Sequence, residues 1–156
     1  MKTFFSTLGL DRFEWGVPEL IQLHAAAAHF PIALFLTSVA CEALGLAFQK
    51  GSLKHQALRT SALWMHVFAT LGAGVTVALG WFGNPWRFKH NDMAQTVRVH
   101  QWWGVATLSF MVLLLCWRLS RRDKLGRWEA AVYGLATLFV MSLVAITGYM
   151  GGHMGE

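Results

Sequence analysis

Charged residues are scarce in this chain. Asp, Glu, Lys and Arg together make up 13% of its 156 residues, about half the share found in soluble domains. Cysteine is rarer still: Cys41 and Cys116 both fall in apolar stretches, where packing is favoured over a disulfide or a metal site. No C-x-x-C-H motif, phosphate loop or nucleophile motif occurs. These absences argue against a soluble hydrolase or phosphotransferase and against covalently attached c-type haem.

Hydrophobic residues, by contrast, make up 55% of the chain and gather in four long stretches. Each is long enough to cross a bilayer, which takes about 20 residues of helix. Helices are expected at about residues 19–48, 61–82, 99–117 and 128–150. Residues 1–18 mix aromatic and charged side chains, which is typical of an interfacial segment. The sequence therefore predicts an all-α polytopic membrane protein, with residues 1–156 forming one antiparallel four-transmembrane-helix bundle.

The basic residues indicate how this bundle is oriented. The net charge is +5. In a membrane protein, the side whose loops carry more Lys and Arg is the cytoplasmic side. The first and third loops hold Lys50, Lys54, Arg59, Arg118, Arg121, Arg122, Lys124 and Arg127, and the opposite side holds Lys2, Arg12, Arg87, Lys89 and Arg98. Both termini are therefore predicted on the periplasmic or exterior side. This distribution reflects topology, and no nucleic-acid partner is expected.

Four histidines are predicted to lie at one end of the bundle. His24 and His29 open the first hydrophobic stretch, His100 opens the third and His153 follows the fourth. In an antiparallel arrangement all four come to the same side of the membrane, and His29 and His100 share a depth roughly 27–30 Å from the cytoplasmic boundary. Ionisable groups near the hydrocarbon are costly and are functional candidates by default.

A set of imidazoles on facing helices predicts a bis-histidine haem b site, holding one haem or two. His29 and His100 are the best axial pair, and His24 and His153 either support them or ligate a second haem. Because His24 and His29 are five residues apart, they lie roughly 140° apart around the helix, and one face cannot present both. Arg87 and Arg98 are expected to pair with propionates, and Gly104 is expected to let the macrocycle approach the backbone.

Other readings of these residues stay open. Tryptophans at helix ends usually form an interfacial belt, and small residues such as Ala69/Ala73 and Thr76/Gly80 usually serve close helix packing. A zinc or copper site is the third possibility, since imidazole suits several metals. No acid or thiolate joins the histidines, which disfavours it.

A second polar group lies near the opposite end. Glu42 and His66 are each roughly 10 Å inside the cytoplasmic boundary. They are expected to pair with each other, or Glu42 with Arg59, as a neutralising contact between helices. A proton or quinone site at this end is the less favoured interpretation.

The segment from His24 to Leu34 resembles the H-x4-HFPIAL signature of an uncharacterised family of small four-helix bacterial inner-membrane proteins. The stretch from Thr147 to Gly152 is similar to the TG-x-x-GG ending of that family. Ala25 stands where the family often has proline, and the chain stops soon after His153. The resemblance implies a location in the bacterial inner membrane, and family members resemble partners of c-type cytochromes and of membrane oxidoreductases.

The function expected from these residues is that of a b-type cytochrome-like subunit in electron transport. It would hold haem near the periplasmic face and pass electrons between quinol or a membrane oxidoreductase and a periplasmic cytochrome c. On its own such a chain is a subunit and not a complete enzyme. The alternative is a cofactor-free scaffold or assembly subunit of a larger membrane complex, in which the histidines serve packing.

Overall fold

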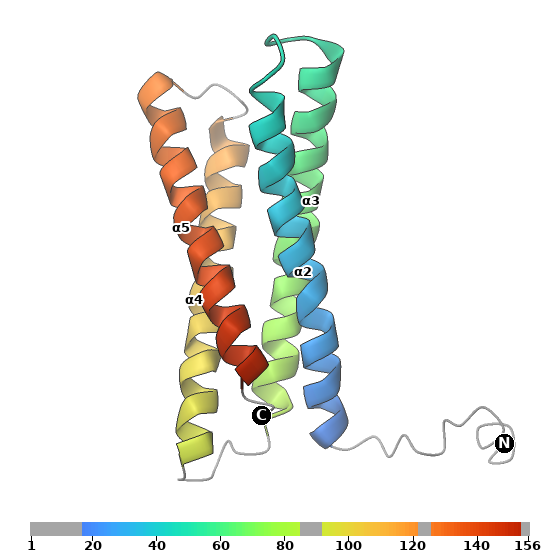
Figure 1. The fold of residues 1–156 in the computed structure, drawn as a ribbon, viewed down its shortest axis with the longest axis vertical. Helices are drawn as coiled ribbons and strands as arrows, with labels where there is room; N and C mark the ends of the chain where they lie inside the picture. The colour runs from blue at the N-terminus through green and yellow to red at the C-terminus, as the bar shows by residue number, and fades with distance from the viewer. Residues whose placement is uncertain (1–16, 85–91, 122–125, 154–156) are drawn as a thin grey trace, which may run out of the picture.

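Four long helices make up the bundle in a computed structural model that describes residues 17–84, 92–121 and 126–153 (Figure 1). They are α2 (Val17–Gly45), α3 (Leu53–Phe82), α4 (Asp92–Arg121) and α5 (Arg127–Gly152). Successive helices run in opposite directions, and no strand occurs in the described part of the chain. Each helix is long and apolar enough to cross a membrane. The predicted all-α membrane bundle is confirmed.

The helix boundaries extend beyond the hydrophobic stretches. α3 begins at Leu53 and not near residue 61 because Ser52 caps it: the Ser52 hydroxyl accepts a hydrogen bond of 3.2 Å from the backbone N–H of His55. α4 begins at Asp92, whose carboxylate suits the positive end of the helix dipole. The first turns of α3 and α4 are polar, and hydropathy alone predicted only the apolar parts of these helices. The helices are therefore longer than predicted. The predicted interfacial segment, residues 1–18, lies almost wholly outside the described residues.

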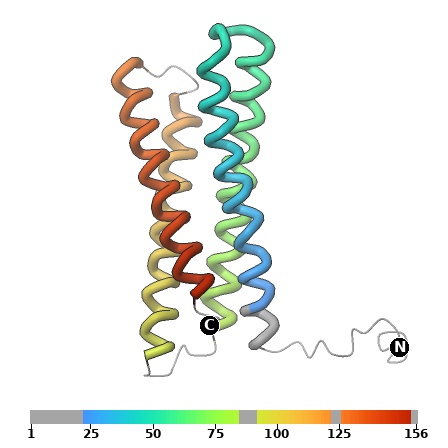
Figure 2. Tube along the Cα trace, viewed as in Figure 1, coloured from blue at the N-terminus to red at the C-terminus, as the bar shows by residue number. Residues whose placement is uncertain are grey.

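The bundle consists of two helix pairs of unequal closeness. α2 and α3 pack most closely, and α2 contacts α5 far more loosely (Figures 1 and 2). Ala62 and Ala69 on α3 are fully buried, which allows the two backbones to approach as small residues do in membrane helices. The Ser38 hydroxyl of α2 donates a 2.7 Å hydrogen bond to the Ala62 carbonyl. The close contact of α2 and α3 makes this pair one wall of the bundle.

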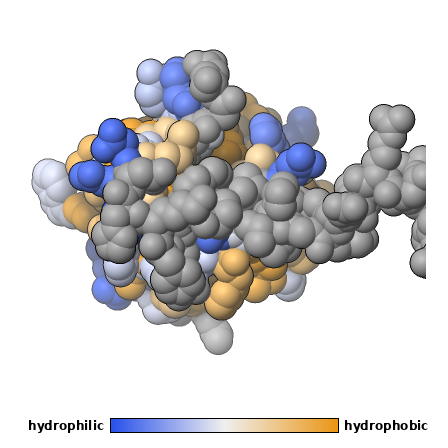
Figure 3. Space-filling view, turned by 90° about the horizontal axis from the view of Figure 1, so that it is seen from below, coloured by the Kyte–Doolittle hydropathy of each residue, from blue (hydrophilic) through white to orange (hydrophobic). Residues whose placement is uncertain are grey.

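Large apolar side chains fill the centre and also cover the outside. Phe35, Met111 and Val140 are the largest fully buried side chains. Exposed side chains along the helices include Phe68, Leu113 and Leu138, which is the surface that a lipid environment favours. At the end that carries the termini, hydrophilic and hydrophobic surface alternates around the rim (Figure 3). Both cysteines have free thiols.

The opposite end is held by a buried arginine. Arg118 on α4 is 6% exposed, and its Nη1 lies 2.8 Å from Oε1 of Glu42 on α2. Its Nη2 donates a 2.8 Å hydrogen bond to the Arg59 carbonyl of α3. Glu42 was expected to pair with His66 or Arg59, and the structure shows in addition an ion pair with Arg118 of α4. His66 instead donates from Nε2 to the Met111 carbonyl at 3.2 Å, with its ring against Phe35.

Removing the charge of Glu42 tests how much this contact holds. In Glu42→Gln the buried guanidinium of Arg118 loses a counter-charge, so we expect the free energy of unfolding to fall by roughly 3 kcal/mol. The measurement is reversible unfolding in mixed micelles followed by helical circular dichroism. The matched control is Glu129→Gln, which removes the partner of the half-exposed Arg121 and should cost less than about 1 kcal/mol. Equal losses in the two variants would contradict the assignment.

Candidate histidine site

His24 points from α2 into the bundle and is held by the neighbouring helix. Its Nδ1 donates a hydrogen bond of 2.8 Å to the backbone carbonyl of Thr76 on α3. Because a carbonyl oxygen only accepts, this bond places the proton on Nδ1 and leaves the lone pair of Nε2 free. Metal-ligating histidines usually have their second nitrogen engaged in this way. His24 is therefore oriented as a ligand would be.

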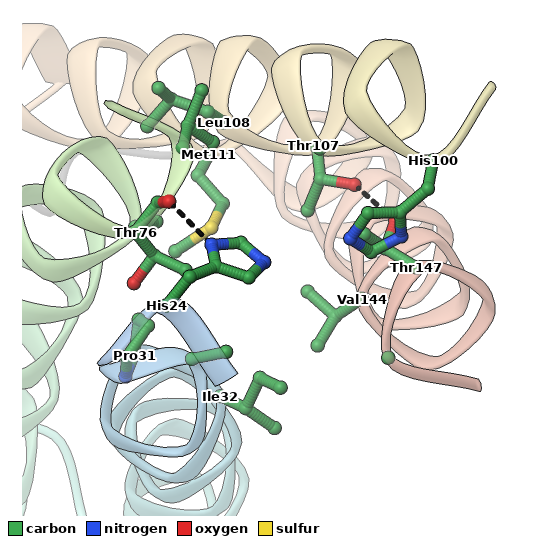
Figure 4. Close-up of a pocket in the computed structure, with 15 residues that line it drawn as sticks. His24, Pro31, Ile32, Thr76, His100, Thr107, Leu108, Met111, Val144 and Thr147 are labelled. Atoms are coloured by element: carbon green, nitrogen blue, oxygen red, sulfur yellow. Dashed lines mark hydrogen bonds between the residues drawn. The ribbon is translucent and has the colours of Figure 1, made fainter. Parts of the chain in front are cut away.

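His100 points into the same space from α4. The ring centroids of His24 and His100 lie 6.0 Å apart, with the two planes at 88°. The Nδ1 atom of His100 is buried and makes no hydrogen bond within the described part of the chain. A buried polar atom without a partner is unusual and calls for an explanation. The two imidazoles face each other across a cavity (Figure 4).

This cavity lies between all four helices and has a volume of about 100 Å³. It runs from the two histidines toward the centre of the bundle, because its α4 lining extends from His100 to Met111, about 16 Å along the helix. The lining is mostly aliphatic and small: Ala28, Pro31, Ile32, Ala73, Val77, Gly104, Leu108, Val144 and Gly148 contribute to it. The site is therefore an apolar slot with two imidazoles at its outer end.

Three threonines bring hydroxyl groups to the lining of the cavity, and each hydroxyl has a hydrogen-bond partner within the protein. Thr76 donates to the Gly72 carbonyl at 2.9 Å. Thr107 donates to the Trp103 carbonyl at 2.8 Å, and its hydroxyl lies 3.1 Å from that of Thr147 on α5. These contacts leave the imidazoles as the polar groups best placed to bind a ligand.

His29 and His153 lie outside this site. His29 is exposed on α2, and its Nδ1 donates to the Ala25 carbonyl of its own helix at 2.9 Å. His153 is also exposed, donates to the Tyr149 carbonyl at 3.1 Å, and stacks on the Tyr149 ring. The structure thus places His24, and not the predicted His29, opposite His100. The reason is direction: His24 and His29 leave the helix on different faces, and only the first faces the bundle.

The remaining predicted residues are distributed unevenly. Gly104 lines the cavity one turn from His100, as expected for a residue that leaves room. Arg98 is exposed near the start of α4, at the same end of the bundle as the histidines. Arg87 lies outside the described residues.

Two residues of the site, Thr76 and Gly80, were not recognised as such in the sequence. The Thr76 carbonyl orients His24, while Gly80 and Gly151 lie against the two imidazole rings. A Cβ built on Gly80 would lie 2.8 Å from Nδ1 of His24. The Thr76/Gly80 spacing had indicated that small residues allow close helix packing. At Gly80 the group that packs closely is the imidazole of His24.

The donor set favours some ligands over others. Within the described residues no group of three or more His, Cys, Asp or Glu side chains could hold a metal ion. Zinc takes at least three protein ligands, whereas haem needs two axial ligands because the porphyrin supplies the other four. Two facing imidazoles therefore match a tetrapyrrole better than a bare ion. The volume does not yet match, since sites for ligands of that size measure roughly 300–1,000 Å³.

The fold and the site define a four-helix membrane protein with a pair of histidines at one end of its bundle. Residues 20–156 match the family described as "Predicted membrane protein (DUF2231)". Since this match covers most of the chain, the protein belongs to that family, and the predicted membership of an uncharacterised membrane-protein family is confirmed. No curated protein and no solved structure matches the chain.

The hydroxyl contact between Thr107 and Thr147 links α4 to α5 beside the cavity, and its strength can be measured. We expect Thr107→Val and Thr147→Val to show a coupling free energy of about 0.6 kcal/mol in a double-mutant cycle of unfolding, as for other hydrogen bonds between membrane helices. Thr37, which is exposed on α2 and donates to its own Ala33 carbonyl, supplies the control. Its coupling to Thr107 should be close to zero. Similar couplings for both pairs would rule out a direct contact.

Proposed function

We propose that this protein is a b-type cytochrome-like electron-transfer subunit that holds one haem between His24 and His100. The observation that carries the proposal is the pair of imidazoles facing each other from α2 and α4 with centroids 6.0 Å apart. Haem b needs two imidazole donors from facing helices, and these two side chains would supply them. A separation of 6.0 Å with the planes at 88° is compatible with such a pair and equally with an edge-to-face contact between two packed rings.

The shape of the slot supports the same ligand. Haem is flat and amphipathic, with an apolar edge and a propionate edge. The cavity is apolar on the side that runs inward from the histidines. The propionate edge would lie toward the outer end, where Arg98 is exposed. Gly104 and Gly148 in the lining present no side chain to a flat group that passes between helices.

The cavity as it stands admits only part of a macrocycle. A site of full size requires the α2/α3 pair to separate from α4 and α5 around the histidines. Such a separation would break the contact of α3 with α4 as well as the looser contact of α2 with α5.

The residues of this chain would then set the properties of the site. His24, whose Nδ1 proton is held by the Thr76 carbonyl, and His100 would together hold the haem. A bound haem supplies a one-electron iron couple. Because the histidines lie at one end of the bundle, that couple would lie near one membrane surface, a position suited to exchange with a water-soluble carrier.

We further propose that this surface is the periplasmic side of a bacterial inner membrane. The partners would be quinol or a membrane oxidoreductase on one side of the reaction and a periplasmic cytochrome c on the other. The charge distribution supports this orientation, because the end opposite the histidines carries Lys50, Lys54, Arg118, Arg121 and Arg127.

A cofactor-free scaffold subunit is the competing function. The small volume of the cavity favours the scaffold function, since a bundle without a cofactor needs no larger cavity. In that case His24 and His100 would serve packing, and the ring of each would rest on a glycine of the next helix. The two proposals differ in whether the purified protein carries haem.

The first prediction of the haem proposal concerns ligation. The protein purified in mild detergent should show sharp α and Soret bands in the reduced-minus-oxidised spectrum, with close to one haem per chain. His24→Ala and His100→Ala should each lose most of that haem, because each removes one of two axial donors. His29→Ala, which removes an exposed imidazole from the same helix, should keep it. Helix content and elution volume check that each variant is folded.

Two outcomes would contradict this proposal in different ways. A colourless, folded wild-type protein from cells supplied with haem would exclude haem binding and favour the scaffold. Haem loss in His29→Ala with retention in His24→Ala would return the axial role to the residue that the sequence alone favoured.

The second prediction concerns orientation. A reporter that is active only in the periplasm should be active when fused after His153 and inactive when inserted at Gly51, in the turn between α2 and α3. Gly51 is exposed in this turn, and exposed loop positions tolerate insertions. The reverse pattern would place the histidine end in the cytoplasm and exclude a periplasmic cytochrome c as the partner.

A further inference from the structure

Two glycines lie directly against the two facing imidazoles, each on a helix other than the one that carries the histidine. Gly80 of α3 lies against His24 of α2, and Gly151 of α5 lies against His100 of α4. A Cβ on Gly80 would lie 2.8 Å from both Cε1 and Nδ1 of His24. A Cβ on Gly151 would lie 3.1 Å from Cε1 of His100.

Other glycines of the same helices have no such neighbour. A Cβ on Gly74 of α3 or on Gly152 of α5 would meet nothing within 4 Å. Glycine in a helix costs roughly 0.5–1 kcal/mol relative to alanine. The imidazole contacts give a physical reason for this cost at Gly80 and Gly151, whereas Gly74 and Gly152 have none from their surroundings.

We infer that Gly80 and Gly151 are positioning residues that set the orientation of the two histidines. The argument for Gly80 is the stricter one, because the atom that its side chain would displace carries the hydrogen bond. Pushing Nδ1 of His24 away from α3 lengthens its 2.8 Å contact with the Thr76 carbonyl. The ring is then free to turn, and Nε2 no longer has a fixed direction into the cavity.

The contact at Gly151 acts differently. At 3.1 Å the neighbour must give way by only a few tenths of an ångström, and Nδ1 of His100 has no hydrogen bond to lose. A side chain at position 151 therefore shifts His100 toward the cavity without releasing its orientation. The effect of alanine should be larger at position 80 than at position 151.

The significance of this arrangement for ligand binding rests on the proposed haem function, but the positioning itself can be tested without haem. The experiment is a double-mutant cycle on the haem-free protein, read as melting temperature in mild detergent. Gly80→Ala should lower the melting temperature when His24 is present. In the His24→Ala background it should leave the melting temperature unchanged or raise it, because the clash has gone and alanine favours the helix.

Gly74→Ala is the matched control on the same helix. It should have the same small effect with and without His24. If Gly80→Ala also has the same effect in both backgrounds, the glycine does not position the histidine and the inference is wrong. This result would leave the haem proposal standing, since that depends on the spectrum of the wild-type protein.

A second measurement reads the hydrogen bond itself. With ¹⁵N-labelled histidine, the Nδ1 proton of His24 should exchange slowly with water in the wild type and in Gly74→Ala. In Gly80→Ala the slow signal should be lost, and a slow signal retained there would overturn the positioning role.

If haem binds, the same variants should rank in its affinity. Losing an orienting contact to a metal ligand typically costs 10–100-fold in affinity, so we expect a loss of roughly tenfold or more in Gly80→Ala. Gly151→Ala should lose less, and Gly152→Ala should match the wild type. Equal affinity in Gly80→Ala and Gly152→Ala would contradict the inference.

Discussion

The close contact between α2 and α3 is the constraint on which the rest of the structure depends. Ala62 and Ala69 bring the two backbones together, and the Ser38 hydroxyl joins them through the Ala62 carbonyl. This closeness puts the Thr76 carbonyl within reach of His24 and forces position 80 to have no side chain. The α4/α5 pair follows a different principle, with aromatic pairs such as Phe110 and Phe139 between the helices. The cavity lies between the closely packed α2/α3 pair and the α4/α5 pair.

The two ends of the bundle use polar groups for different purposes. At one end Arg118 contacts the Glu42 carboxylate and the Arg59 carbonyl, and these contacts join three helices. At the other end the two imidazoles have nitrogen positions left over: the lone pair of Nε2 in His24 and the buried Nδ1 in His100. Buried polar groups are costly unless they are paired. The first group joins helices, whereas the second group is the one on which the haem proposal rests.

Hydropathy and charge were enough to predict four crossing helices, because lipid requires long apolar segments whose backbone is satisfied internally. Counting residues along each helix was enough to bring the histidines to one end. It could not say which histidine faces inward, since the direction of a side chain around a helix depends on where the neighbouring helices lie. Glu42 shows the same limit, as Arg118 is far from it in the chain. Gly80 gave no signal of its own, because glycine in a membrane helix is commonplace.

The buried Arg118 has a consequence for how the bundle can move. A guanidinium that contacts both α2 and α3 from α4 prevents these helices from sliding along one another at that end. Any widening of the slot must then be a splaying of the opposite end, with the arginine layer acting as the pivot. Guest molecules would accordingly enter from the histidine end. The buried side chains of Phe35, Met111 and Val140 pack together at the inner end of the cavity. They would limit the depth to which a ligand penetrates.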